Sequence, residues 1–216
     1  MTTCALVAAS DFNADHFKAL NDTGGFDYVV AVDAGFAYLE KLGVKPDLAI
    51  GDFDSLGYVP KARRVSKHPQ HKDQSDLELA LERVSTRRYS HIHVYGALGG
   101  RLDHTLANLQ LFASYAEQGF DITAIDTNCA LRVLVGPDAF DLPPFKSGTV
   151  SVFSATDVSH GVSERGLEYP LDDADLTNRT SLGLSNELIG QEAAVSVAEG
   201  TLYVFYPLAD SAAVSE

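Results

Sequence analysis

The hydrophobic pattern of this chain changes near residue 128, and that change constrains the fold more than any other feature. Before it, short β-type runs alternate with helical patterns, as in βα units built around a parallel sheet. The β-type runs cover residues 5–9, 28–32, 48–50, 91–95 and 122–125, and the helical patterns cover 14–20, 34–42, 76–87 and 102–118. We therefore expect residues 1–128 to form an open α/β domain with a mainly parallel, Rossmann-like sheet.

After residue 128 the chain has short β-type runs divided by Gly, Pro, Asp and Ser, and no convincing helical pattern. The runs are "ALRVLVG", "GTVSVFSA", "GLEYPL", "AAVSVA" and "TLYVFYPL". They predict a smaller all-β domain, a sandwich or barrel, over residues 129–216. Two stretches of this half, "PDAFDLPPFKSG" and residues 172–179, match no pattern that places them.

Charge and apolar content limit the partners of the chain. The 30 acidic and 16 basic residues give a net charge of −14, which would repel a nucleic acid or an anionic membrane, but a few local groups could still hold a small phosphorylated ligand. The apolar run at residues 4–10 is too short to span a membrane and no basic residue precedes it, so we expect a cytoplasmic protein. Cys4 and Cys129 are expected to be buried thiols.

Four polar clusters follow β-type runs, where open α/β sheets place their ligands. They are "VDAGF", "GDFDS", "HKDQSD" and "GALGGRLDH". In the second cluster, Asp52 and Asp54 would project to the same side of an extended chain, and their oxygens suit Mg²⁺ or Mn²⁺. Taken alone, this pair fits a strand-ending turn with solvated carboxylates better.

The cluster "HKDQSD" changes that balance. Ser75 and Glu78 fit a capping box, and an acid at Asp76 suits the first turn of the helix. This explanation does not account for Asp73 or Lys72. Two acidic pairs beyond the same sheet edge would repel each other, and a divalent cation is the simplest way to bring them together. Lys72 is placed to meet a phosphate.

The cluster "GALGGRLDH" offers groups that bind anions. Gly99 and Gly100 precede a helix that starts near Arg101, so free N–H groups and a guanidinium would converge at the helix start. The spacing is neither G-x-G-x-x-G nor G-x-x-x-x-G-K-[ST], which argues against a dinucleotide fingerprint and a P-loop. A tight strand-to-helix turn explains the glycines equally well, and His104 could be a partner of Asp103 or a surface residue.

The helix that follows has apolar residues at helical spacing. They are Leu102, Leu106, Leu109, Ala113 and Ala116. The spacing predicts a buried stripe along the whole helix.

In this order and spacing, "VDAGF", "KPDLAIGDFDS", "KDQSDLELAL" and "GALGGRLDH" resemble the motifs of the thiamine pyrophosphokinase (thiamine diphosphokinase) family, and "GLEYPL" and "SLGLSNE" look like its C-terminal pattern. The resemblance implies an α/β catalytic domain that binds ATP and Mg²⁺, a β-sandwich that binds thiamine and dimerises, and a homodimer with active sites between subunits. It also implies transfer of a pyrophosphoryl group from ATP to the hydroxyl of thiamine, which gives thiamine diphosphate and AMP.

The resemblance also implies roles for individual residues. The catalytic carboxylates would be Asp52, Asp54, Asp73, Asp76 and Asp103, and the first four of these would also be the metal ligands. The ATP side would comprise Asp33, Ala34, Gly35, Gly99, Gly100, Arg101 and His104, joined by Lys72 through its charge. The thiamine side would comprise Ser185 and Asn186, with Tyr169 as the aromatic that stacks on the thiamine ring because the chain has no Trp. A packed strand tyrosine explains Tyr169 equally well.

Three other functions fit part of the pattern. A nucleotide-sugar glycosyltransferase also has D-x-D after an apolar run, but it would not need "KDQSD" and "GGRLDH" to follow. A haloacid-dehalogenase-type phosphatase normally has its first Asp near the start of the domain and an isolated Lys later. A non-catalytic thiamine- or nucleotide-sensing module would be expected to lose the metal carboxylates. Because all of these carboxylates are present, the sequence favours the enzyme.

Overall fold

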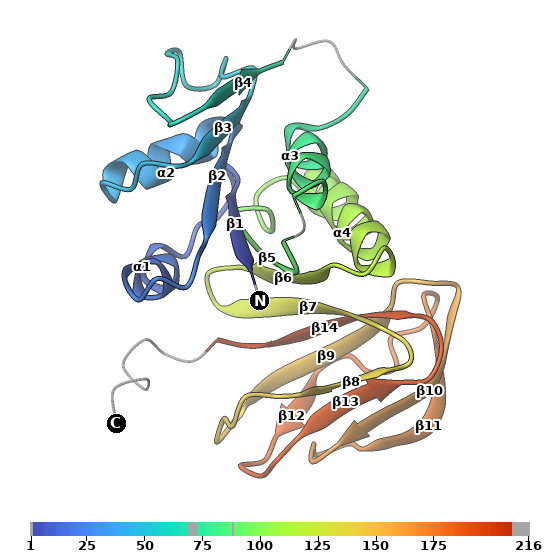
Figure 1. Cartoon of the computed structure of the whole chain (residues 1–216). Coiled ribbons are helices and arrows are strands. Elements are labelled where there is room, and N and C mark those ends of the chain that lie inside the picture. The colour runs from blue at the N-terminus through green and yellow to red at the C-terminus, as the bar shows by residue number, and fades with distance from the viewer. Residues whose placement is uncertain (1, 69–72, 88, 209–216) are drawn as a thin grey trace. The chain divides into compact units, whose positions relative to one another are not determined.

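The computed structural model of the chain describes residues 2–68, 73–87 and 89–208 (Figure 1). The chain divides into two compact units. Unit 1 comprises Met1–Leu111 and Gly119–Thr127, and unit 2 comprises Phe112–Gln118 and Asn128–Glu216. The long helix α4 (Leu102–Glu117) therefore contributes residues to both units.

Unit 1 contains a parallel sheet with the strand order β6-β5-β1-β2-β3-β4. The strands are β1 (Thr3–Val7), β2 (Tyr28–Val32), β3 (Leu48–Gly51), β4 (Val65–Lys67), β5 (His91–Tyr95) and β6 (Asp121–Ile125). All residues of β2 and β3 are buried, as expected for central strands that are covered on both faces. The edge strand β4 has only exposed and half-buried residues, which explains its weak signal in the sequence.

The helical elements of this unit are α1 (Ala14–Asp22), the 3-10 turn η1 (Asp33–Gly35) that leads into α2 (Phe36–Lys41), α3 (Asp76–Ser85) and the first part of α4. Two of them begin at a side-chain cap, α1 at Asn13 and α3 at Ser75. Figure 1 shows α1 and α2 on one face of the parallel sheet and α3 on the other. The predicted N-cap of α3 is confirmed, because the Ser75 hydroxyl accepts a hydrogen bond from the Glu78 N–H at 3.1 Å.

The predicted buried stripe of α4 is wrong over the first half of the helix. Leu102 is 83% exposed and Leu106 is 60% exposed, whereas Phe112, Ala113 and Ala116 are buried. The buried residues all belong to the part of α4 that lies in unit 2. Helical spacing indicates which residues share a face, but it does not indicate how far along the helix a core accompanies that face.

Unit 2 contains two antiparallel sheets, with strand orders β12-β9-β14-β7 and β11-β10-β13-β8. Its strands are β7 (Cys129–Val135), β8 (Asp138–Asp141), β9 (Gly148–Ser154), β10 (Val158–Arg165), β11 (Leu171–Thr177), β12 (Asn186–Leu188), β13 (Ala194–Val197) and β14 (Thr201–Pro207). Both sheets contribute to one hydrophobic cluster, for example through Val152 of β9 and Val162 of β10. The two stretches that the sequence left unplaced contain β8 and β11, whose residues are mostly polar and exposed.

Two further expectations concern membranes and cysteines. Within the part of the chain that the structure describes, we find no helix whose length and apolar character would let it span a bilayer. Cys4 is a fully buried thiol, as predicted, and Cys129 is a half-buried one. Burial raises the pKa of the Cys4 thiol far above its usual range, so this group stays protonated.

The strand order of unit 1 reverses between β1 and β5, and we call this place the reversal point. From β1 the chain builds β2, β3 and β4 on one side, and it then returns to place β5 and β6 on the other. The loops after β1 and β5 therefore diverge, and in open α/β sheets such divergence opens a crevice at the carboxyl ends of the strands.

Glycine backbone approaches the end of β1 closely on both sides of that crevice. A Cβ added at Gly96 would lie 2.4 Å from the carbonyl oxygen of Ala8, and one added at Gly35 would lie 2.0 Å from the carbonyl oxygen of Val7. Only residues without a side chain can be this close to the strand end. Gly35 in the "VDAGF" cluster is therefore required by packing, whatever else it does.

Replacing Gly35→Ala should lower the free energy of unfolding by about 3 kcal/mol, because the added methyl group would overlap backbone atoms of β1. Gly57→Ala is the matched control. Gly57 has a φ of +70° and no atom within 4 Å of an added Cβ, so its replacement should cost only about 1 kcal/mol of left-handed strain. Urea denaturation followed by circular dichroism measures both values, and equal losses would contradict the close-approach explanation.

Candidate functional site

A cavity of about 450 Å³ lies at the reversal point, within unit 1. It is lined by Ala8, Ala9, Ser10, Asp11, Val32, Asp33, Tyr38, Ser75, Asp76, Leu77, Gly96, Ala97, Gly99, Gly100, Arg101, His104 and Asn108. Its walls come from the ends of β1, β2 and β5 and from the starts of α3 and α4. Both the place and the volume are those of a small-molecule site in an open α/β sheet.

The cavity contains some of the predicted site residues of unit 1 and not others. Those that line it are Asp33, Asp76, Gly99, Gly100, Arg101 and His104. Those that the structure describes elsewhere are Ala34, Gly35, Asp52, Asp54, Asp73 and Asp103. Lys72 lies outside the described residues. The two sides of the predicted ATP site, after β2 and after β5, thus meet at one cavity.

Asp33 is held in an unusual backbone conformation at the end of β2. Its φ is +46°, and a Cβ on Gly51 of β3 would lie 3.0 Å from its Cα, so the two segments are in close contact. The Asp33 side chain is half-buried, and its Oδ1 atom is buried without a hydrogen-bond partner among the residues that the structure describes. An unpartnered buried oxygen that borders a cavity is a place where a ligand or cation would be stabilised.

Two carboxylates, Asp33 and Asp76, line this part of the cavity, and the charge of Asp52 also acts on Asp33. Burial raises the pKa of Asp33, and the negative charges of Asp76 and Asp52 raise it further, against hydrogen bonds from Ala34 and Ser55. Yet no three His, Cys, Asp or Glu side chains among the described residues are arranged to hold one metal ion. The structure therefore concentrates hard oxygen donors, which suit Mg²⁺, without a closed metal centre.

Asp52 and Asp54 follow β3 in a turn, so the prediction that rested on an extended chain does not hold. The Asp54 N–H donates to Asp52 Oδ1 at 3.0 Å, and Phe53 between them has a φ of +62°. Phe53 is only 4% exposed, as expected if it anchors the turn in the core. Asp52 is half-buried and Asp54 is exposed. The turn keeps the two carboxylates close together by a different route from the one the spacing suggested.

The start of α3 contributes one of its two predicted acids to the cavity. Asp76 is the first helical residue and is half-buried, and Ser75 beside it also lines the cavity. Asp73 is exposed. The helix start therefore presents N–H groups and one carboxylate to the same space.

The glycine loop after β5 forms the opposite wall. Gly99 and Gly100 have φ values of +77° and +61°, and side-chain atoms of Asp11 and Ser10 pack where their Cβ atoms would be. Both φ values lie in the left-handed region, so a side chain at either glycine would strain the backbone. Both glycines line the cavity.

Arg101 and Asp103 form an exposed ion pair at the start of α4. Arg101 Nε and Nη2 donate to the two Asp103 oxygens at 3.1 and 2.6 Å. The bond from Arg101 lowers the pKa of Asp103 to about 2, with a smaller contribution from the His104 N–H. Asp103 is therefore ionised at neutral pH and is a poor proton acceptor there.

Five polar residues that line the cavity were not predicted as site residues by the sequence analysis: Ser10, Asp11, Tyr38, Ser75 and Asn108. Asn108 Nδ2 donates to the Ala97 carbonyl at 2.7 Å, and the Tyr38 hydroxyl donates to the Ser10 carbonyl at 3.0 Å. The Ser10 Oγ atom is buried and has no partner among the described residues. The signal was present, because "AASDF" follows β1 just as the other clusters follow their strands.

The predicted thiamine-side residues lie in unit 2 and differ in exposure. The Tyr169 side chain is available, since the residue is 63% exposed. Ser185 is also exposed, and its backbone has a φ of +58°. Asn186 is only 4% exposed, and its side chain is bonded inside the unit. Tyr169 and Ser185 are therefore exposed enough to contact a ligand. The Asn186 side chain is buried and is not.

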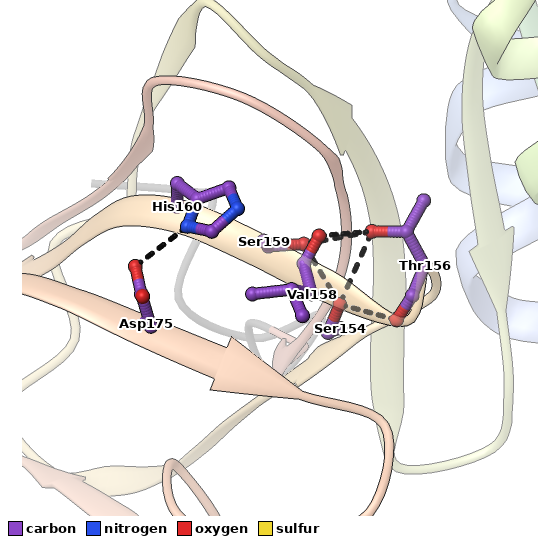
Figure 2. Close-up of polar contacts among 6 residues, drawn as sticks. All are labelled: Ser154, Thr156, Val158, Ser159, His160 and Asp175. Carbon is purple, nitrogen blue, oxygen red and sulfur yellow. Dashed lines mark hydrogen bonds and ion pairs between the residues drawn. The ribbon is translucent and has the colours of Figure 1, made fainter.

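Unit 2 also brings Ser, His and Asp residues near one another, which raises the question of a nucleophilic triad. Figure 2 shows that they belong to separate groups: His160 Nδ1 is 2.8 Å from Asp175, while the Ser159 hydroxyl bonds Ser154 at 2.8 Å. His160 is exposed and Ser159 is completely buried. Neighbours on a strand point to opposite faces, so the imidazole does not serve the hydroxyl.

Comparison with known proteins is in agreement with these features. Residues 23–124 match the family model "Thiamin pyrophosphokinase, catalytic domain", and residues 140–202 match "Thiamin pyrophosphokinase, vitamin B1 binding domain". A thiamine pyrophosphokinase of Bacillus subtilis is 31% identical over 181 residues, which is 80% of this chain and 84% of the relative.

Solved structures agree in fold over nearly the whole length. The crystal structure of thiamine pyrophosphokinase from Bacillus subtilis matches with a TM-score of 0.80 and 27% identity, and it covers 95% of this chain and 99% of its own. Thiamin pyrophosphokinase from Geobacillus thermodenitrificans matches with a TM-score of 0.78 and 27% identity, covering 97% and 99%. This chain belongs to the thiamin pyrophosphokinase family.

Proposed function

We propose that this enzyme transfers a pyrophosphoryl group from ATP to the hydroxyl of thiamine, giving thiamine diphosphate and AMP. The observation that carries the proposal is the cavity at the reversal point, which a glycine loop, Arg101 and the carboxylates of Asp33 and Asp76 line together. Membership of the family favours this function over a nucleotide-sugar transferase, a phosphatase or a sensing module.

The ATP side of the proposal is built on the loop after β5. The backbone of Gly99 and Gly100 and the start of α4 would hold phosphates through N–H groups, with Arg101 and His104 beside them. The Asp103 carboxylate accepts hydrogen bonds from the Arg101 guanidinium. This ion pair would keep the guanidinium oriented until a phosphate replaces the carboxylate as its partner. We therefore assign Asp103 to the orientation of Arg101. The residues Ala34 and Gly35 would support the loop that carries Asp33.

Mg²⁺ is part of the proposal. Asp52, Asp54, Asp73 and Asp76 would hold it, since carboxylate oxygens are the donors that Mg²⁺ prefers. The raised pKa of Asp33 and its unpartnered Oδ1 atom support a cation in this region. When bound, the ion would neutralise charge on the phosphates, which phosphoryl-type transfer needs more than a strong nucleophile. The carboxylates of the chain would then orient the reacting groups.

We further propose that residues 1–128 act as a Rossmann-like catalytic domain and residues 129–216 as a β-sandwich that binds thiamine through Tyr169 and Ser185. The shared hydrophobic cluster of the two antiparallel sheets supports the sandwich description. A cytoplasmic homodimer with active sites between subunits completes the proposal. Exposed apolar side chains in both units, such as Leu106 and Leu184, support self-association because it would cover them.

The assay that tests the activity uses purified protein, ATP, Mg²⁺ and thiamine, with chromatographic separation of AMP from ADP. AMP should form only when thiamine is present, because the thiamine hydroxyl accepts two phosphoryl groups in one step. Chelation of Mg²⁺ should abolish the reaction. ADP or free phosphate as the product would contradict the proposed function.

Asp54→Asn should lower kcat by about 100-fold or more while the fold survives, because it removes a charge expected to help hold Mg²⁺. Asp54 is exposed, so the amide has room. Asp15→Asn is the matched control, since Asp15 is an exposed acid in the first turn of α1 and does not line the cavity. Steady-state kinetics and thermal melts check both variants. Wild-type turnover in Asp54→Asn would return Asp54 to the role of a turn residue.

Sedimentation equilibrium tests the dimer. The active protein should sediment with twice the mass of one chain, and dilution into the monomer range should reduce the specific activity, because each proposed site needs both subunits. A monomer with full activity would contradict the site shared between subunits, but it would not contradict the proposed reaction.

A further inference from the structure

Unit 2 contains a carboxyl group with no place in the function described so far. Glu164 of β10 has 0% exposure and lies two residues after Val162, on the face of the strand that meets the hydrophobic core. Burial raises the pKa of this carboxyl, and the hydrogen bond from Asn186 only partly offsets it. A buried carboxyl in an apolar core costs stability, so its contacts should reveal what it does.

Glu164 contacts two parts of the segment Gly183–Asn186. Its Oε2 atom accepts a hydrogen bond from Asn186 Nδ2 at 2.7 Å. Its Oε1 atom is buried and lies against Gly183, where an added Cβ would be 3.3 Å away. The carboxyl therefore lies beneath both ends of the segment that carries Ser185.

Asn186 links this carboxyl to the loop that carries Tyr169. Its Nδ2 group also donates to the Tyr169 carbonyl at 2.8 Å, and its Oδ1 atom accepts from the N–H groups of Tyr169 and Glu187 at 3.0 and 2.9 Å. Both amide protons and both oxygen lone pairs are thus used. The fully bonded amide fixes the Tyr169 backbone to β12.

Glu164 is one of the partners that fix which way this amide faces. If the Asn186 side chain turned over, its oxygen would face the Glu164 oxygen and the Tyr169 carbonyl, and its NH₂ group would face two N–H donors. The bonds of the amide to the Tyr169 carbonyl and from the two N–H donors would then be lost. An acceptor at position 164 adds a further bond that favours the observed orientation.

The backbone of Ser185 is strained, and hydrogen bonds to β9 hold it in place. Its φ of +58° lies in the left-handed region, and its N–H donates to the Ser151 hydroxyl at 3.0 Å. The neighbouring Gly183 carbonyl accepts from the Val152 N–H at 2.9 Å. These two bonds, which link Ser185 itself and Gly183 to residues of β9, thus hold a conformation that Ser185 would not adopt by itself.

We propose that Glu164 is a positioning residue for thiamine, which acts through Asn186 to fix the exposed groups Tyr169 and Ser185 in the arrangement that binds the vitamin. The inference rests on the proposed function, because it takes Tyr169 and Ser185 as the thiamine contacts. It assigns Asn186 to their support instead of to direct contact.

The experiment compares Glu164→Gln with Glu164→Leu in the full-length enzyme. Gln keeps an acceptor of the same reach, so its KM for thiamine should stay within about twofold of the wild type. Leu fills the space but accepts no bond, so the KM for thiamine should rise about tenfold, as expected for one lost buried hydrogen bond, while the KM for ATP stays within about twofold. Glu164→Asp, which is one methylene shorter, should raise the thiamine KM in the same selective way and replaces the Leu variant if that variant does not fold.

Ser159→Ala is the control for a general loss of stability in unit 2. Ser159 is as buried as Glu164, and its hydroxyl bonds Ser154 and Thr156 (Figure 2), neither of which belongs to the segment Gly183–Asn186. It should melt at a lower temperature and keep the thiamine KM of the wild type.

The outcomes separate the two proposals. An active wild type whose Leu and Asp variants keep the thiamine KM, or raise both KM values together, would overturn the positioning role alone. A rise in the thiamine KM of Ser159→Ala equal to that of the Leu variant would also overturn it. A wild type that forms no AMP with thiamine would overturn the proposed function and this inference with it.

Discussion

The end of β1 is the constraint on which the rest of unit 1 depends. Two glycines, Gly35 and Gly96, bring the chain against the last carbonyl groups of this strand, one from each side of the reversal point. The approach brings Asp33 and the loop after β5 to the rim of one cavity. A side chain at either position would push its loop away, so the close backbone packing and the site have the same origin.

The crowding of acids at this site works against stability. Burial and the charges of Asp76 and Asp52 raise the pKa of Asp33, so the folded chain holds a proton on it more tightly than the unfolded chain does. The stability of the fold therefore falls as pH rises from the unfolded value near 4 through the raised folded value. At neutral pH the metal-free protein carries this cost, and a bound cation would offset it. Such a cost is expected where carboxylates are placed for chemistry and not for packing.

Much of the fold and part of the site could be predicted from the sequence. The change from βα units to short β runs is a pattern of local hydrophobicity, which the buried strands preserve. The position of polar clusters directly after strands pointed to Asp33, Asp76 and the glycine loop, which line the cavity. Spacing could not show that Asp52 and Asp54 lie in a turn in which Phe53 has a φ of +62°. Two features depend on residues distant in sequence: how much of the apolar face of α4 is covered, and whether the polar segment β11 forms a strand. Asn186 as a thiamine-site residue stays a prediction: the structure buries its side chain, and burial is a tertiary property that the motif does not carry.

The bonding state of buried polar atoms distinguishes groups that await a ligand from groups that support one. At the cavity, Asp33 Oδ1 and Ser10 Oγ are buried and have no partner within the described part of the chain, and a ligand can supply the missing bonds. In unit 2 the Asn186 amide is saturated and can only orient its neighbours. Glu164 Oε1 also lacks a partner among the described residues, but the residue has 0% exposure and this atom lies against Gly183, so no ligand reaches it. Burial raises the pKa of this carboxyl, and in either protonation state it can accept the bond from Asn186, which is all that its supporting role requires.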